Sequence, residues 1–308
     1  MNPFEIKKIL VPVDFSGTGE KVLEQAIMMA TKAKASITLV TSLEGPLSNA
    51  GPDLFGVSIN HKEKYEDAVM DWVKQHMEAF KKKLIAGGVP NVDYIIEKGS
   101  PYKKIVATAQ KIKADIIIMG THGVSGVREF VVGSNTFRVV SEAQCPVLSI
   151  QKHITRPGFK EILLPFRGKE HSREKVNYGI DIAKLYGSSI YVLGISYDTD
   201  PSAVRKIQLE ADQIVEIIQK AGVNCTEEVI GGNYEEKLIF EHAKKVKADL
   251  IIAMSDLDTM EISELVSGPF IQHLVNHSQI PILSIRPKYN PHPIHDAGED
   301  AGDWSFWG

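Results

Sequence analysis

The chain has 308 residues, enough for about two domains, and its 43% hydrophobic and 24% charged residues are an ordinary globular balance. With 35 basic and 39 acidic side chains, the formal charge is -4, so composition gives no general attraction to nucleic acid or to an anionic membrane. The charge is uneven, because residues 1–152 hold 19 basic and 16 acidic side chains and the remainder hold 16 and 23. If one half binds an anion, the first half is therefore the better candidate.

The two cysteines, Cys145 and Cys225, stand far apart and show neither CxxC nor Cys/His metal spacing. This usage indicates a reducing compartment and excludes a disulfide framework or a zinc module. The N-terminal segment lacks the apolar stretch of a signal peptide, and no run approaches the roughly 18 apolar residues of a membrane span. We therefore expect a cytoplasmic protein whose partners include neither nucleic acid nor a membrane.

In chain order, the first half alternates short apolar runs with stretches of helical periodicity. The runs are typical of strands buried on both faces of a parallel sheet, and they occupy 9–13, 37–40, 92–96, 116–119 and 147–150. The helices predicted between them occupy 20–33, 62–86, 101–113 and 134–143. This alternation predicts a doubly wound α/β fold. A long Gly/Pro-rich connection at 44–60 is expected to be functional or mobile.

The second half repeats the first in order. Four segments return, pairing 4–15 (FEIKKILVPVDF) with 159–167 (FKEILLPFR), 34–43 with 187–196, 111–120 (KIKADIIIMG) with 245–254 (KVKADLIIAM), and 144–150 (QCPVLSI) with 279–285 (QIPILSI). Collinear matches of this kind indicate a tandem duplication of about 150 residues. We expect two doubly wound domains, each with a parallel five-stranded sheet, at residues 1–152 and 153–288, and a C-terminal tail at 289–308.

A spaced glycine pattern follows the fourth apolar run, in GTHGVSGVREFVVGSNTF at 120–137. It reads G-x2-G-x9-G-S, and the last glycine, Gly133, precedes Ser134, where a helix is predicted to begin. Ligands of open α/β sheets bind beyond the carboxyl ends of the strands, and helix N-termini present backbone N–H groups to phosphate. The hydroxyls of Ser134 and Thr136 would add hydrogen bonds or bind a metal ion. We predict a nucleotide or phosphate site here, and the alternative is a flexible loop before a helix.

These features resemble the universal stress protein family across both halves, to about Pro287. The glycine pattern is that family's ATP-binding signature, and an aspartate at the end of the first strand, here Asp14, is its second mark. The resemblance implies an adenine nucleotide alpha hydrolase-like fold and a pseudo-dimer of the two domains that meet through their last strands, at 147–150 and 282–285. It also implies ATP, or else ADP or AMP, as the ligand, with Mg²⁺ as a candidate companion.

The same resemblance assigns the residues of the nucleotide site. The nucleoside would be held by Pro12, Val13, Asp14 and Thr41. The ribose and phosphates would be held by Met119, Gly120, His122, Gly123, Gly133, Ser134, Asn135 and Thr136. Arg128, in the same loop, faces either the phosphates or solvent. Without the family, Asp14 could equally be a helix N-cap or a turn acceptor.

The second half departs from this pattern. Arg167 stands where the first half has Asp14, and Pro269 replaces Ser134, which removes one N–H donor from the helix start. We therefore expect that the second half has lost ATP binding and has a structural or regulatory role.

The motifs do not indicate a strong hydrolase. The sequence has no Walker motif, GxSxG elbow or HExxH, and no paired base that would activate water is evident. The favoured function is a stress-response or regulatory protein that binds ATP in its first half with slow or no hydrolysis, so no catalytic residue is assigned. The alternatives are an interaction scaffold with a vestigial motif and a weak ATPase. A homodimer and an unidentified protein partner are left open.

Histidines near the end of the second half raise the question of a metal. His273 and His277 are four residues apart on a predicted helix, and with His292, His295 and Asp296 they could form a metal site. A polar helix face is the favoured interpretation, so no metal site is assigned.

The tail is acidic and ends in three aromatic residues, Trp304, Phe306 and Trp307. Most tails of this composition are disordered, but these aromatic side chains would also suit docking onto an apolar groove or a partner.

Overall fold

The structure is a computed structural model that describes residues 4–15, 19–44, 62–121, 134–151, 154, 157–167, 174–196, 199–232, 236–255 and 270–286. Most of the long connection after Glu44 and the whole C-terminal tail lie outside these residues, so the expectations for them stay predictions.

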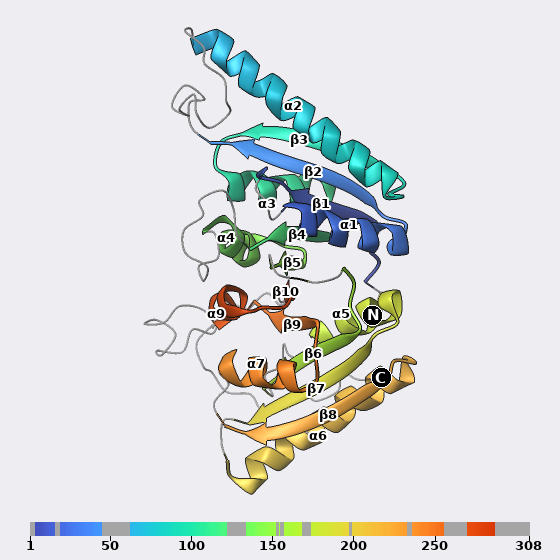
Figure 1. Cartoon of the computed structure of the whole chain (residues 1–308). Helices are drawn as coiled ribbons and strands as arrows, with labels where there is room; N and C mark the ends of the chain where they lie inside the picture. Colours follow the sequence, from blue (N-terminus) through green and yellow to red (C-terminus); the bar gives the residue numbers. More distant parts are fainter. Residues whose placement is uncertain are drawn as a thin grey trace, which may run out of the picture.

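Ten strands form one continuous sheet in the order β3-β2-β1-β4-β5-β10-β9-β6-β7-β8 (Figure 1). The first repeat supplies β1 (Lys8–Pro12), β2 (Ser36–Leu43), β3 (Val92–Lys98), β4 (Ile116–Gly120) and β5 (Val147–Ile150). The second repeat supplies β6 (Glu161–Phe166), β7 (Ser189–Ser196), β8 (Cys225–Gly231), β9 (Leu250–Met254) and β10 (Ile282–Ile285). Strands within each repeat are parallel, which confirms the predicted fold class, and the two five-stranded sheets join into one mixed sheet.

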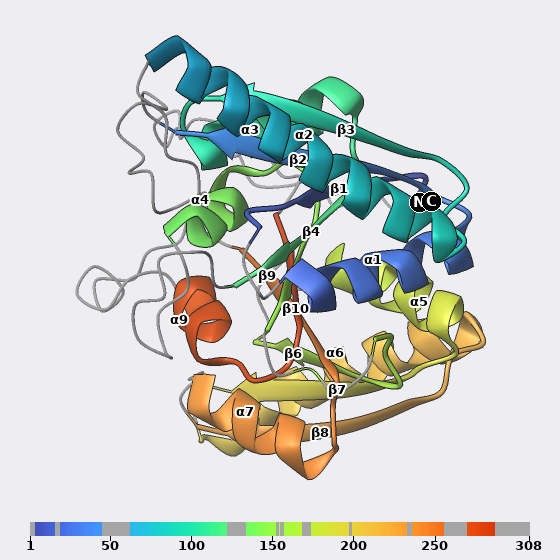
Figure 2. The same ribbon diagram turned by 45° about the horizontal axis from the view of Figure 1, so that its top comes forward.

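Helices cover both faces of the sheet (Figures 1 and 2). One face carries α1 (Gly19–Ala33), α2 (Lys62–Ala86), α5 (Glu174–Tyr186) and α6 (Pro201–Lys220). The other face carries α3 (Pro101–Ile112), α4 (Ser134–Glu142), α7 (Glu236–Lys245) and α9 (Phe270–His277). The four helices of the first repeat begin and end within one residue of the prediction. The strands β2 and β3 run longer than predicted because their pairing continues past the apolar run, as far as Leu43 opposite Lys98.

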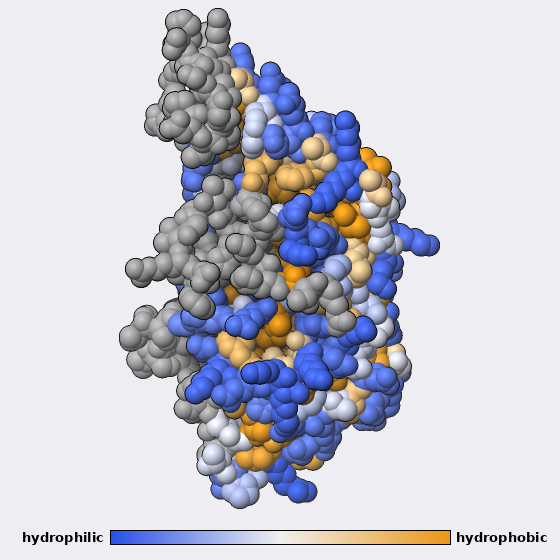
Figure 3. All heavy atoms as spheres, in the orientation of Figure 1, coloured by the Kyte–Doolittle hydropathy of each residue, from blue (hydrophilic) through white to orange (hydrophobic). Residues whose placement is uncertain are grey.

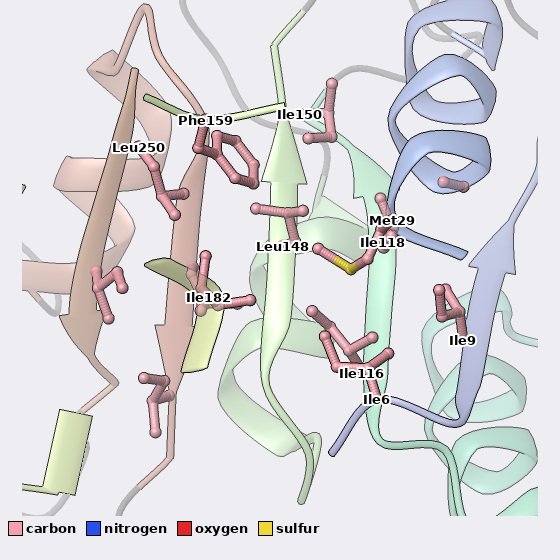
Figure 4. Packing of buried hydrophobic residues seen from close by; sticks show 14 of the residues in the cluster. Ile6, Ile9, Met29, Ile116, Ile118, Leu148, Ile150, Phe159, Ile182 and Leu250 are labelled. Atoms are coloured by element: carbon pink, nitrogen blue, oxygen red, sulfur yellow. The ribbon is translucent and has the colours of Figure 1, made fainter. Parts of the chain in front are cut away.

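The core has two apolar layers, one on each side of the sheet. Successive residues of a buried strand point to opposite faces, so Ile9 packs in the layer under α1 and Leu10 in the layer under α3. Figure 4 shows Met29 of α1 beside Ile118 of β4, with Leu148 on the neighbouring strand. The layer under α1 and α5 is continuous from one repeat to the other, so the two repeats share a core.

The repeats join through their last strands. Strands β5 and β10 are antiparallel, with Leu283 opposite Leu148 at the centre of the pairing. This confirms the expected contact between the segments 147–150 and 282–285. Because each strand would otherwise end its sheet with unpaired N–H and C=O groups, the pairing satisfies both edges at once.

A second joint lies on the face that carries α1 and α5, which lie side by side (Figure 2). The buried Gln25 side chain accepts a hydrogen bond from the Gly158 N–H at 2.8 Å and donates one to the Tyr186 hydroxyl at 3.1 Å. Gly158 has φ +85°, and a Cβ there would lie 2.6 Å from the sulfur of Met28, so the position requires glycine. The linker is therefore fixed against the first repeat.

The repeated K-x-K-A-D motif has a structural role at the amino ends of the strands. One carboxylate oxygen of Asp115 accepts hydrogen bonds from the backbone N–H groups of Lys7 and Lys8, each at 2.8 Å. Asp249 makes the same contact at the start of β6. The second lysine of each motif, Lys113 or Lys247, adopts a left-handed backbone conformation that ends the preceding helix.

The surface is largely hydrophilic on the face in Figure 3, where polar side chains alternate with smaller apolar patches. Such alternation is expected where amphipathic helices cover a sheet. Within the described ranges, no helix combines the length and apolar character needed to cross a membrane.

The shared core predicts that weakening the strand pairing will destabilise both repeats together. Leu148 is 1% exposed, so Leu148→Ala should lower the free energy of unfolding by roughly 2–5 kcal/mol. Ile85 is 52% exposed, so Ile85→Ala should change it by less than about 0.5 kcal/mol. Urea denaturation followed by circular dichroism measures both, and equal effects of the two substitutions would contradict a core that runs through the seam.

Candidate functional site

The connection direction of the sheet reverses between β1 and β4, at their carboxyl ends. The chain leaves β1 for β2 on one side and returns to β4 on the other, so β1 and β4 are neighbours at the point where the connection direction reverses. In open α/β sheets this is where ligands bind. Asp14 lies two residues beyond the end of β1 and Gly120 ends β4, so the structure brings these two parts of the predicted site to one edge of the sheet.

The end of β1 is held firmly by its neighbour β2. Pro12 lies opposite Val40, and the Val13 N–H donates a hydrogen bond to the Val40 carbonyl at 2.9 Å. Val13 is buried, and the next residue, Asp14, is exposed. The carboxylate therefore stands at the strand end with the backbone beneath it fixed by the sheet.

Phe15 fixes the direction in which the chain leaves β1. Its φ of +60° is unusual for a residue with a side chain and costs free energy. Its ring packs edge-on against Trp72, with centroids 5.1 Å apart, and stacks on Phe80 at 5.9 Å. We infer that these contacts of α2 offset the backbone strain. Sequence reasoning missed this anchor, although aromatic rings four residues apart on α2, at Trp72, His76 and Phe80, were a usable signal.

The start of α4 is tied to the end of β4. The Thr136 hydroxyl donates a hydrogen bond to the Gly120 carbonyl at 2.9 Å, and the Thr121 N–H donates to Ile150 of β5 at 3.0 Å. A threonine hydroxyl has one proton, so in this arrangement Thr136 does not donate its hydroxyl to a phosphate. Its contribution at this point is to hold the first turn of α4, whose backbone N–H groups lack partners within the helix, beside the strand end.

The remaining predicted residues fall into two groups. Thr41 of β2 and Met119 of β4 are buried at the strand ends, and Asn135 is partly exposed in the first turn of α4. Ser134 is the first residue of α4. The other predicted residues lie outside the described part of the chain, and they are His122, Gly123, Arg128 and Gly133.

The second repeat differs at the two positions equivalent to Val13 and Thr41. There, Phe166 lies opposite Gly194 in the pairing of β6 with β7. Phe166 is fully buried, and a Cβ on Gly194 would lie 3.1 Å from its ring and 2.8 Å from Ile207 of α6. The Phe166 ring on β6 thus occupies space that is free because Gly194 on β7 has no side chain.

A buried cation also lies at the end of β6. Lys175 is 3% exposed, and its ammonium donates a hydrogen bond to the carbonyl of Pro165, the counterpart of Pro12. The equivalent position of the first repeat holds Val22, which is also 3% exposed, so the second repeat has a buried cation where the first has a smaller apolar side chain. The strand end of the second repeat is therefore filled by its own side chains, which supports the expectation from Arg167 and Pro269 that this half has lost the site.

Burial explains why the pKa values of both cysteine thiols are raised. Desolvation raises the pKa of the Cys145 thiol to about 11 and that of the Cys225 thiol to about 12. Both groups are protonated at neutral pH, so neither is a candidate nucleophile. In contrast, hydrogen bonds from Lys245 and Tyr191 lower the pKa of the Glu228 carboxyl. The bond from Lys245 also joins α7 to β8 of the sheet.

Comparison with known proteins places this architecture in a class. Two tandem α/β units, each with parallel strands, define a duplicated, doubly wound protein. The model of the universal stress protein family matches residues 5–151 and 158–286. The chain belongs to the universal stress protein family and carries two of its domains in tandem.

Individual relatives agree with this assignment. A universal stress protein of Methanocaldococcus jannaschii is 34% identical over 157 residues, which cover 47% of this chain and 95% of the relative. The crystal structure of a universal stress protein from Archaeoglobus fulgidus DSM 4304 covers 92% of this chain and 98% of its own, with a TM-score of 0.72 at 19% identity, and so shares the fold. Another universal stress protein, solved in complex with cAMP, covers 48% of this chain with a TM-score of 0.36 at 17% identity.

The inward lysine of the second repeat should contribute more to stability than a surface lysine on the equivalent helix of the first repeat. Lys175→Ala removes a buried, charge-assisted hydrogen bond and the packing of the lysine stem, and should lower the free energy of unfolding by about 1–3 kcal/mol. Lys21→Ala removes only a partly exposed ion pair, and should cost about 0.5 kcal/mol or less. Chemical denaturation of the two variants measures the difference, and an equal cost would mean that Lys175 does not support the end of β6.

Proposed function

We propose that the first repeat binds ATP, or another adenine nucleotide such as ADP or AMP, at the carboxyl ends of β1 and β4. Asp14 contacts the nucleoside, and the glycine-rich segment after Gly120 and the first turn of α4 hold the phosphates, with Mg²⁺ where it accompanies them. The observation that carries the proposal is the position of Asp14, Gly120 and the start of α4 around one strand-reversal point.

The helix start supports phosphate as the group bound there. The first N–H groups of α4 have no partner within the helix, and the helix dipole favours an anion at this end. The bond from Thr136 to Gly120 keeps this turn beside β4, so the donors need not be ordered when the ligand arrives. Preorganised donors of this kind improve affinity because less conformational entropy is lost on binding.

The proposed stoichiometry is one nucleotide per chain. Phe166 and Lys175 fill the strand end of the second repeat, where the first repeat has the smaller side chains of Val13 and Val22. The second repeat then serves as the structural partner of the first, through β5 and β10.

The proposed chemistry is binding with slow or no hydrolysis. Fast phosphoryl transfer to water needs a group that orients the nucleophile and positive charges that stabilise the transition state. The proposed site has no evident paired base to activate water, which suits a ligand whose presence, rather than its turnover, carries the signal.

Isothermal titration calorimetry with ATP and Mg²⁺ tests the proposal. We expect one saturable site per chain. Gly133→Asp puts a side chain and a negative charge where phosphate is proposed, and should abolish binding. The matched control is Gly268→Asp, at the equivalent position of the second repeat, which should leave the binding isotherm unchanged. Titrations with ADP and AMP identify the preferred nucleotide.

Three results would change the conclusion. Two sites per chain would show that the second repeat also binds. No heat at millimolar ATP, with Gly133→Asp indistinguishable from the parent, would favour an interaction scaffold with a vestigial motif. Steady-state release of phosphate that Asp14→Asn removes would establish a weak ATPase.

A further inference from the structure

Three potential metal ligands meet between α7 and α9, away from the strand ends of the first repeat. Glu236 is the first residue of α7, and His273 and His277 lie one turn apart on α9. The Nδ1 atom of His273 lies 3.7 Å from a carboxylate oxygen of Glu236, and ligand atoms of the three residues lie within 4.8 Å of one another. The two imidazole rings have centroids 5.8 Å apart. The helices α7 and α9 are in contact, so the cluster lies at a packed junction.

The first repeat shows what this junction contains without such ligands. The residues equivalent to Glu236, His273 and His277 are Tyr102, Arg138 and Glu142. There, the Arg138 guanidinium lies over the Tyr102 ring, 4.8 Å from its centroid, and the cation–π contact joins α3 to α4. In the second repeat a carboxylate and two imidazoles stand at the same three positions. The cation–π contact of the first repeat is therefore replaced by three side chains that can each bind a metal ion.

The geometry is close to that of a three-ligand zinc site. A tetrahedral zinc ion with bonds of about 2.1 Å holds its ligand atoms about 3.4 Å apart. The pair from Glu236 and His273 is already near this separation. His277 is exposed, so its ring can turn toward the others without disturbing the core. Histidines at i and i+4 with a carboxylate from a second element are a ligand set that suits zinc and neighbouring divalent transition metals.

We propose that Glu236, His273 and His277 bind a divalent transition-metal ion of the zinc type at the junction of α7 and α9. The three side chains supply three ligands, and water completes the coordination. Because the ligands come from two helices, the ion fixes the start of α7 to α9, the task that the Tyr102–Arg138 contact performs in the first repeat. The site is separate from the proposed nucleotide site, and its test does not depend on nucleotide binding.

Calorimetric titration of the full chain with Zn²⁺ in a non-chelating buffer tests the proposal. The titration is done in a His292→Ala/His295→Ala background, because these tail histidines could bind zinc by themselves. One Zn²⁺ should bind per chain with micromolar or tighter affinity. His273→Ala/His277→Ala should remove this site, and Glu236→Gln, which keeps the shape of the side chain, should weaken binding by about tenfold or more.

Two further measurements separate a built site from surface adsorption. Co²⁺ in place of Zn²⁺ should give intense visible absorption bands typical of four-coordinate cobalt, and these bands should disappear in His273→Ala/His277→Ala. Saturating Zn²⁺ should raise the melting temperature of the parent and leave that of the double variant unchanged. Arg138→Ala, at the matched position of the first repeat, should bind Zn²⁺ as the parent does.

The proposal fails on either of two results. One is the absence of saturable Zn²⁺ binding in the micromolar range. The other is binding that persists with the same affinity in His273→Ala/His277→Ala, provided that circular dichroism shows the variant to be folded. Because all three side chains are at least partly exposed, their substitution is not expected to prevent folding.

Discussion

The antiparallel pairing of β5 with β10 is the constraint on which the rest of the molecule depends. Each repeat alone would end in a short, hydrophobic strand with one unpaired edge, which is a surface prone to association. Pairing the two edges inside one chain satisfies them and makes the layer under α1 and α5 continuous. The joint at Gln25 and Gly158 can form only because this pairing brings α1 and α5 together. The chain thus obtains within itself the contact that a separate single-domain copy would have to find in solution.

Within this common frame, a few side chains make the repeats chemically different. The exchange of Val13 and Thr41 for Phe166 and Gly194 preserves the volume between the strands and so preserves the fold. The inward turn of Lys175 places a positive charge against a carbonyl at the strand end. Neither change affects the register of the sheet, so the two repeats can differ at these strand ends and still pair through β5 and β10.

The parts of this structure that the sequence predicts are those that depend on local pattern. Apolar runs marked the strands, helical periodicity marked the helices, and the internal repeat gave the two domains because both copies obey the same packing rules. Asp14 and Gly120 could be placed together because the carboxyl ends of parallel strands share an edge.

The features that escaped prediction depend on contacts between distant segments. The bond from Thr136 to Gly120 redirects a hydroxyl that the sequence assigns to phosphate, because only the folded chain places the carbonyl beside it. The left-handed Phe15 is held by rings on α2 that are more than fifty residues away. Glu236 could not be associated with His273 from spacing, since the contact between α7 and α9 arises from tertiary packing.

The pair Phe166 and Gly194 also shows how firmly packing fixes the difference between the two repeats. Shortening Phe166 alone leaves an unfilled volume beside a glycine, whereas enlarging Gly194 alone brings a Cβ to within 2.8 Å of Ile207 and 3.1 Å of the phenyl ring. Each single change toward the first repeat's pair is therefore destabilising. Converting Phe166 and Gly194 to the Val13–Thr41 arrangement would need coordinated substitutions on two strands, so stability alone keeps the two strand ends different.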